Sequence, residues 1–280
     1  MRSSKRFPKA LCVLLALLSL CGCARPAPMP QVPDSGSAKI NLTAADLQTT
    51  AQDPVAIALG EESIVNITTG GSYLLSGNLN GSIVIDVGQQ KVHLILQNVS
   101  VSAPTGPALE VVSAKQLILT LPAGTESSFR DSGKYPVNGK ADACIYATCD
   151  LTVNGEGKLN VSGYFKDAIH TNDTLKLLND ACFVQSKRDG LHGNDGVALR
   201  CKDLTVQCER NGIYATKTGK TGRGNVEIIE TSGSVIGGQY AISCAADLYI
   251  SQSNIHAAGV YDRLQVAGSS YIEEGSLSDG

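Results

Sequence analysis

The chain has 280 residues, of which 42% are hydrophobic, 18% are charged and none is Trp. This hydrophobic content excludes a disordered chain, and 29 Gly residues argue against a helical bundle. The net charge of −3 gives no sign of a nucleic-acid partner.

The N-terminus has the features of a secretory signal. Four basic residues and no acidic one precede a short apolar run at 10–20. The run ends in Leu-Cys-Gly-Cys, which resembles a bacterial lipobox and would place a lipid on Cys23. We therefore expect a signal peptide at 1–22 and an extracytoplasmic protein anchored to the cell membrane by its lipid; simple secretion is the alternative. Removal of 1–22 changes the net charge to −7, and the Pro-rich stretch 23–38 is expected to be a flexible tether.

The rest of the chain is an internal repeat. The segments 167–173, 189–195 and 211–217 align without gaps and start 22 residues apart. Each contains one residue of an apolar column, which comprises Ile145, Ile169, Leu191, Ile213 and Ile242. Two further apolar pairs follow in each repeat, and the repeat after Ile213 fits if seven residues are inserted within 215–225. No single repeat can bury its own apolar face, so the repeats must stack.

These features predict an all-β fold, a right-handed parallel β-helix with about 22–25 residues per coil. We expect the β-helix domain to span 39–260, with 41–62 capping its first coil and 261–280 forming a C-terminal cap or tail. Cys182 falls in an apolar column and is expected in the core, whereas His93 and His256 are isolated and expected at the surface. The pairing of the remaining cysteines is left open.

Several segments in order resemble a family of bacterial surface proteins with a carbohydrate-binding domain. They include Gly-Ser-Tyr-Leu-Leu-Ser-Gly-Asn-Leu at 71–79, Leu-Thr-Leu-Pro-Ala-Gly-Thr at 119–125 and Asp-Ala-Cys-Ile-Tyr at 142–146. The resemblance covers about 46–259. It implies a pectate-lyase-like parallel β-helix with calcium sites that binds cellulose and polygalacturonate without established catalysis. The first Asp of the coil is replaced by Asn211 and then by Tyr240, so the resemblance implies a shorter metal array toward the C-terminus.

Stacking brings equivalent acids together. The acid column consists of Asp167, Asp189 and Asn211, and a second acid column consists of Asp173 and Asp195. Carboxylates about 4.8 Å apart repel by roughly 3 kcal/mol at an effective dielectric constant near 20. Two solutions are open: calcium bound by these five residues, or neutralisation by neighbouring cations without a metal.

Two more columns could contact a ligand. The cation column of Lys166, Arg188 and Arg210 could bind the repeated carboxylates of a polyuronate, or it could be a set of solvated ion pairs. The aromatic column comprises Tyr146, His170, His192 and Tyr214. Its last three members could stack on sugar rings, or the whole column could shield the strand edge.

Three functions fit these features. The first is a monomeric, non-catalytic surface lipoprotein that binds acidic or cellulosic polysaccharide with the help of calcium. The second is a calcium-dependent polysaccharide lyase, in which Arg188 or Arg210 would act as the base. The third is a structural surface spacer or adhesin.

Overall fold

The computed structural model describes residues 40–280 except 220–221. The expected signal peptide, the lipidation site at Cys23 and the tether at 23–38 lie outside the described residues. Within the described ranges, no helix is long and apolar enough to cross a membrane.

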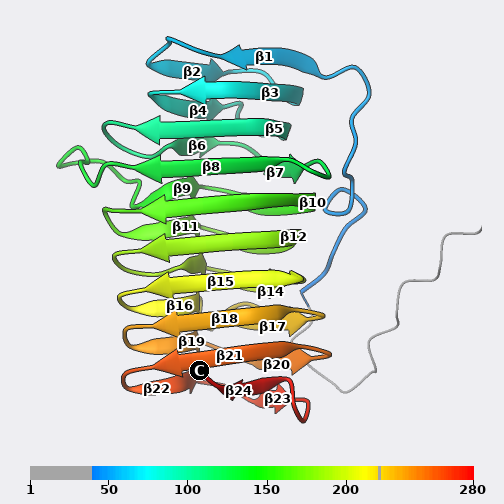
Figure 1. Cartoon of the computed structure of the whole chain (residues 1–280), viewed down its shortest axis with the longest axis vertical. Coiled ribbons are helices and arrows are strands. Elements are labelled where there is room, and N and C mark those ends of the chain that lie inside the picture. Colours follow the sequence, from blue (N-terminus) through cyan, green and yellow to red (C-terminus); the bar gives the residue numbers. More distant parts are fainter. Residues whose placement is uncertain (1–39, 220–221) are drawn as a thin grey trace, which may run out of the picture. The chain divides into compact units, whose positions relative to one another are not determined.

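The described chain is a stack of coils built from parallel strands (Figure 1). The main row of the larger sheet contains β1 (Val55–Leu59), β3 (Gly71–Leu79), β5 (Lys91–Ala103), β7 (Gln116–Leu121), β10 (Asp150–Gly163), β12 (Thr174–Ser186), β14 (Gly196–Leu199), β17 (Asn225–Ile229), β20 (Leu248–Ser251) and β23 (Ser270–Ile272). A second row of the same sheet uses the C-terminal halves of its long strands together with β8 (Glu126–Asp131), β15 (Asp203–Cys208), β18 (Ser232–Gly237), β21 (Asn254–Gly259) and β24 (Leu277–Asp279).

The smaller sheet closes each coil. It contains β2 (Ile64–Ile67), β4 (Ser82–Asp86), β6 (Leu109–Ser113), β9 (Ala143–Ala147), β11 (Asp167–Thr171), β13 (Leu191–Gly193), β16 (Asn211–Ala215), β19 (Tyr240–Cys244) and β22 (Asp262–Val266). The fold is therefore a parallel β-helix, which confirms the predicted class.

The register follows the sequence repeat. Ile169 pairs with Leu191, Leu191 pairs with Ile213, and these side chains are buried in one continuous core. Val197 pairs with Val226, so the inserted residues do lie before β17. The six cysteines of the described chain are unpaired and buried, and Cys182 is in the core as expected.

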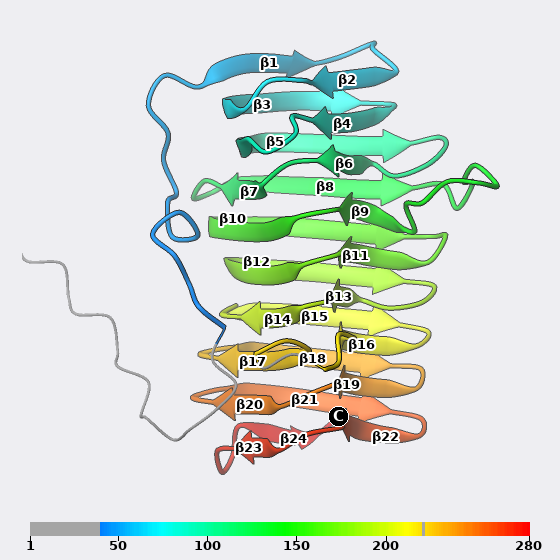
Figure 2. The ribbon, with the colours of Figure 1, turned by 180° about the vertical axis from the view of Figure 1, so that it is seen from behind.

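The ends of the domain differ from expectation. β22, β23 and β24 pair with β19, β20 and β21, so the β-helix continues beyond residue 260 and 261–280 is neither a separate cap nor a tail. At the other end, β1 and β2 form a coil of their own rather than a cap. The chain before them, residues 40–53, runs along the side of the stack from β17 to β1 and is named the strap (Figures 1 and 2).

One buried carboxylate fastens the strap to three coils. Asp46 is fully buried and accepts hydrogen bonds from Lys176 Nζ at 2.9 Å, Gln116 Nε2 at 2.9 Å and Thr152 Oγ1 at 2.6 Å. Burial alone would raise the pKa of Asp46, but the bonds from Lys176, Thr152 and Thr43 outweigh it and lower the pKa. The carboxylate is therefore ionised at neutral pH.

The expectation that His93 lies at the surface is wrong, and its link to the strap explains why. His93 is buried rather than exposed, and its Nε2 lies 2.7 Å from Thr120 Oγ1. Thr120 donates to Asn154, and Asn154 Nδ2 donates to the carbonyl oxygen of Asp46 at 2.9 Å. This chain of hydrogen bonds links His93 to the strap, and burial lowers the pKa of His93. His256 is exposed, as expected.

Replacing Asp46 by Ala leaves Lys176 buried without its partner. We expect the free energy of unfolding to fall by about 3–5 kcal/mol in urea denaturation. The double variant Asp46→Leu/Lys176→Met removes both charges and should recover part of this loss, because Gln116 and Thr152 still lack their acceptor. A loss below about 1 kcal/mol for Asp46→Ala would show that the strap adds no stability.

Candidate functional site

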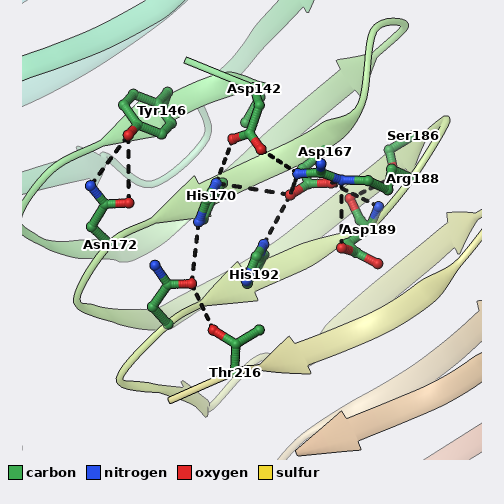
Figure 3. A network of polar contacts seen from close by, with 12 residues as sticks. Asp142, Tyr146, Asp167, His170, Asn172, Ser186, Arg188, Asp189, His192 and Thr216 are labelled. Carbon is green, nitrogen blue, oxygen red and sulfur yellow. Dashed lines mark hydrogen bonds and ion pairs between the residues drawn. The ribbon is translucent and has the colours of Figure 1, made fainter. Parts of the chain in front are cut away.

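The cation and acid columns meet where the second row of the larger sheet turns into the smaller sheet (Figure 3). We name this cluster the charged corner; it consists of Asp142, Asp167, Arg188, Asp189 and Arg210. Backbone hydrogen bonds hold the coils in register here: Arg188 N donates to the Lys166 carbonyl, and Arg210 N donates to the Arg188 carbonyl. Each arginine side chain reaches back by one coil and binds the aspartate of the coil before it.

Asp167 is fully buried, and four donors occupy its carboxylate. Its Oδ1 accepts from Arg188 Nε at 2.5 Å and from Asp189 N at 3.0 Å. Its Oδ2 accepts from Arg188 Nη2 at 2.7 Å and faces His192 Nδ1 at 2.9 Å. Burial would raise the pKa of Asp167, but Arg188 and His192 lower it. All of its lone-pair positions are used by the protein.

Asp189 repeats this arrangement one coil later. It is fully buried, and its Oδ1 accepts from Arg210 Nε at 2.7 Å and from Asn211 N at 3.1 Å and Nδ2 at 3.0 Å. Arg210 Nη2 binds the other oxygen. Asn211 thus serves as a donor to the acid before it. The sequence left two ways to offset the repulsion between these carboxylates, calcium or neighbouring cations. The observed geometry is neutralisation by the neighbouring cations.

Arg188 joins three coils. Its Nη2 also binds Asp142, and its Nε lies 3.7 Å from Asp189 Oδ2. Burial opposes a charged guanidinium, but Asp167 and Asp142 outweigh it and raise the pKa of Arg188. Asp189 raises the pKa of Arg210 in the same way. Neither arginine is suited to act as the base of a lyase, because removal of its proton would break a buried ion pair.

The histidines of the aromatic column belong to the same network. The His170 and His192 rings stack at 3.9 Å between centroids with planes 2° apart. His170 Nδ1 lies 2.6 Å from Asp142 Oδ1, and both rings are over nine-tenths buried. Burial, together with the neighbouring His170, lowers the pKa of His192 despite the carboxylates nearby. Asp167, His170 and His192 lie close enough to hold a metal ion, but hydrogen bonds and Arg188 already occupy the carboxylate.

The outer members of these columns behave differently. Tyr214 is half-buried, and Arg210 lies 5.2 Å from the centre of its ring. Tyr146 hydroxyl bonds to Asn172. Lys166 Nζ lies over the ring of Phe165, 5.0 Å from its centre. Of the predicted ligand-binding residues, His170 and His192 are therefore buried, whereas Lys166, Arg188, Arg210 and Tyr214 are partly exposed.

In the second acid column, Asp195 is neutralised more fully than Asp173. Asp195 pairs with Lys217 at 3.3 Å and Arg223 at 3.2 Å. Burial and the nearby carboxylates of Asp150 and Asp195 raise the pKa of Asp173. If calcium binds to the predicted ligands, Asp173 and Asp195 fit it better than Asp167 and Asp189. The calcium prediction stays a prediction for all five residues.

A groove beside the charged corner was not anticipated from the sequence. Tyr164 is 48% exposed in the turn between β10 and β11, and it lines hollows on both sides. One hollow of about 290 Å³ is bordered by Gln185, Lys187 and Gln207. The other, of about 400 Å³, is bordered by Ser102 and Arg130. The only signal in the sequence was a Tyr-Phe-Lys run at the turn before Asp167.

Comparison with known proteins identifies the class. The family model of carbohydrate-binding domain-containing proteins matches residues 61–275, so the chain belongs to this family. A carbohydrate-binding domain-containing protein of Acetivibrio thermocellus is 28% identical over 171 residues, which is 59% of this chain and 59% of the relative's length. The polysaccharide lyase-like protein from C. thermocellum, solved as a gadolinium derivative, superposes with a TM-score of 0.75 at 23% identity. The match covers 81% of this chain and 99% of that one, and it shows a shared fold.

The ionic network makes stability depend on pH. The unfolded chain protonates His192 near pH 6.5, whereas the folded chain resists this because the pKa of His192 is lowered. The contribution of His192 to the free energy of unfolding is therefore fully present above about pH 6.5. Below that pH it declines, by at most about 1.4 kcal/mol per pH unit. Asp142 and Asp167, whose pKa values are lowered, add a further loss below about pH 4.

Urea denaturation at several pH values tests whether the loss of stability that begins near about pH 6.5 comes from His192. The variant His192→Gln should lose the decline between pH 6.5 and 5, whereas His256→Gln, which changes an exposed residue, should keep it. An equal decline in both variants would contradict the assignment to His192.

Proposed function

We propose that the protein is a lipid-anchored cell-surface protein that binds acidic polysaccharide along the turn edge, without catalysis. The turn edge is the line of turns between the second row of the larger sheet and the smaller sheet. Family membership supports carbohydrate binding, and the signal at 1–23 supports the anchor. The observation that supports this location of the binding surface is Tyr164, an exposed aromatic ring between two polar hollows.

The chemistry of the hollows suits a sugar chain. The Tyr164 ring can stack on the apolar face of a sugar, as aromatic side chains do at binding sites. The amides of Gln185 and Gln207 and the hydroxyl of Ser102 border the same groove and can hydrogen-bond to sugar hydroxyls. The surface therefore combines one stacking platform with several neutral donors and acceptors.

Cations on this edge favour an acidic polymer. Arg130 and Lys187 are exposed in the two hollows, and Lys166 lies between them along the chain. Lys187 pairs with Glu209 at 2.6 Å, but both side chains are more than half exposed, so the pair is worth little and a uronate can replace Glu209. These cations are gathered on one edge of a chain whose mature net charge is −7.

The edge is long enough for several sugar units. The backbone ladder continues from Lys166 through Arg188, Arg210 and Gln239 to Tyr261, whose side chain is 69% exposed. Four coil steps separate Lys166 from Tyr261, a distance of about 19 Å. A polysaccharide lying parallel to the axis of the stack would meet aromatic rings at both ends and cations between them.

The lyase and spacer alternatives are less well supported. The arginines proposed as bases are held as cations by buried carboxylates, which leaves the lyase without its base. Substitution of Asp167 and Asp189 cannot separate binding from a spacer role, because both acids are buried in the charged corner. Exposed residues of the turn edge provide the cleaner test.

Tyr164→Ala and Lys187→Ala should each weaken binding to polygalacturonate by roughly tenfold, about 1.4 kcal/mol. Matched controls lie elsewhere on the molecule. Tyr271→Ala removes another half-exposed ring, and Lys202→Ala breaks the comparable exposed pair with Asp180. Affinity electrophoresis measures all four variants. The proposed edge is wrong if the two controls lose as much affinity as the two edge variants.

A further inference from the structure

The space around the Arg188 guanidinium has the composition of a cation site. Four carboxylate oxygens from three coils surround it: one of Asp142, both of Asp167 and one of Asp189. Two of the three acids are fully buried. Clustered carboxylate oxygens are the ligands that calcium prefers, yet here they face a side chain of the protein itself.

We propose that Arg188 is a built-in replacement for a structural divalent cation. The charged corner is complete without metal, and it becomes a calcium site when the guanidinium is removed. Arg188 is the one cationic side chain within the described residues that reaches Asp142, Asp167 and Asp189 together. Its two bonds to Asp167, together with the contacts from Asp189 N and His192 Nδ1, leave no free lone pair on that carboxylate for a metal.

The geometry explains why a guanidinium can take the place of a divalent cation at this point of the stack. A planar guanidinium donates from several nitrogens in fixed directions, so it can bind two carboxylates at once while its charge offsets a third. The backbone ladder holds the three acids in place whatever lies between their side chains, because Asp167 N donates to the Asp142 carbonyl and Ala168 N donates to the Asp189 carbonyl. Removal of the side chain would leave three ionised acids around a vacated volume.

Arg210 is a second arginine that occupies the place of a cation, with fewer acids around it. It neutralises Asp189 of the preceding coil, and the neighbouring Asn211 has its Oδ1 buried without a hydrogen-bond partner. Loss of Arg210 would free the Asp189 oxygens that it binds, and rotation of the Asn211 amide would then present its unused oxygen to the same space. This pocket contains fewer acids than the one around Arg188, so its affinity for a divalent cation should be lower.

Calorimetric titration of the mature chain with calcium tests the proposal. Arg188→Ser should bind one calcium ion more per chain than the unmodified protein, and its melting temperature should rise when calcium is added. The added Asp167→Asn substitution should remove both effects. Arg188→Lys keeps a positive charge at the corner and should gain no ion.

Other outcomes decide against the proposal. It is overturned if folded Arg188→Ser gains no ion, or if Asp167→Asn removes a calcium ion from the unmodified protein. If Arg188→Ser folds only in the presence of calcium, the proposal is supported. If Arg188→Ser does not fold in either condition, Arg210→Ser decides, because it leaves the three-coil contacts of Arg188 intact.

Discussion

The in-register stacking of parallel coils is the constraint on which the rest of the structure depends. Each strand places its side chains directly over those of the preceding coil, so every residue type chosen for one coil meets its counterpart in the next. For Ile and Leu this builds a continuous core. For aspartate it places like charges together in a buried position, and the fold must supply a compensating charge.

The protein supplies that charge from its own sequence. Arg188 and Arg210 each reach back to the aspartate of the coil before, so each of these two coils neutralises its neighbour. The strap uses the same principle on the opposite side of the coils, where the buried Asp46 pairs with Lys176. Charges within the stack are thus committed to structure, which leaves the exposed groups of the turn edge to meet a ligand.

The sequence revealed the repeat because Leu and Ile recur at a spacing that survives one insertion before Val226. It singled out Asp167, Arg188, Asp189 and Arg210 but missed Asp142 and misjudged the burial of the two acids, since nothing in the spacing shows that Arg188 turns back toward Asp167. The strap was missed because the partners of Asp46 lie between 70 and 130 residues away in the chain. Tyr164 was missed because it lies in a turn, outside the aligned columns.

The most direct test is the migration of the mature chain through a gel containing polygalacturonate, first with calcium and then with a chelator. Because the cations of the turn edge are side chains, retardation should occur in both conditions. Retardation that requires calcium would contradict the account, since a metal rather than these side chains would then join the polymer to the protein. Free migration in both conditions would exclude acidic polysaccharide of this kind as the ligand.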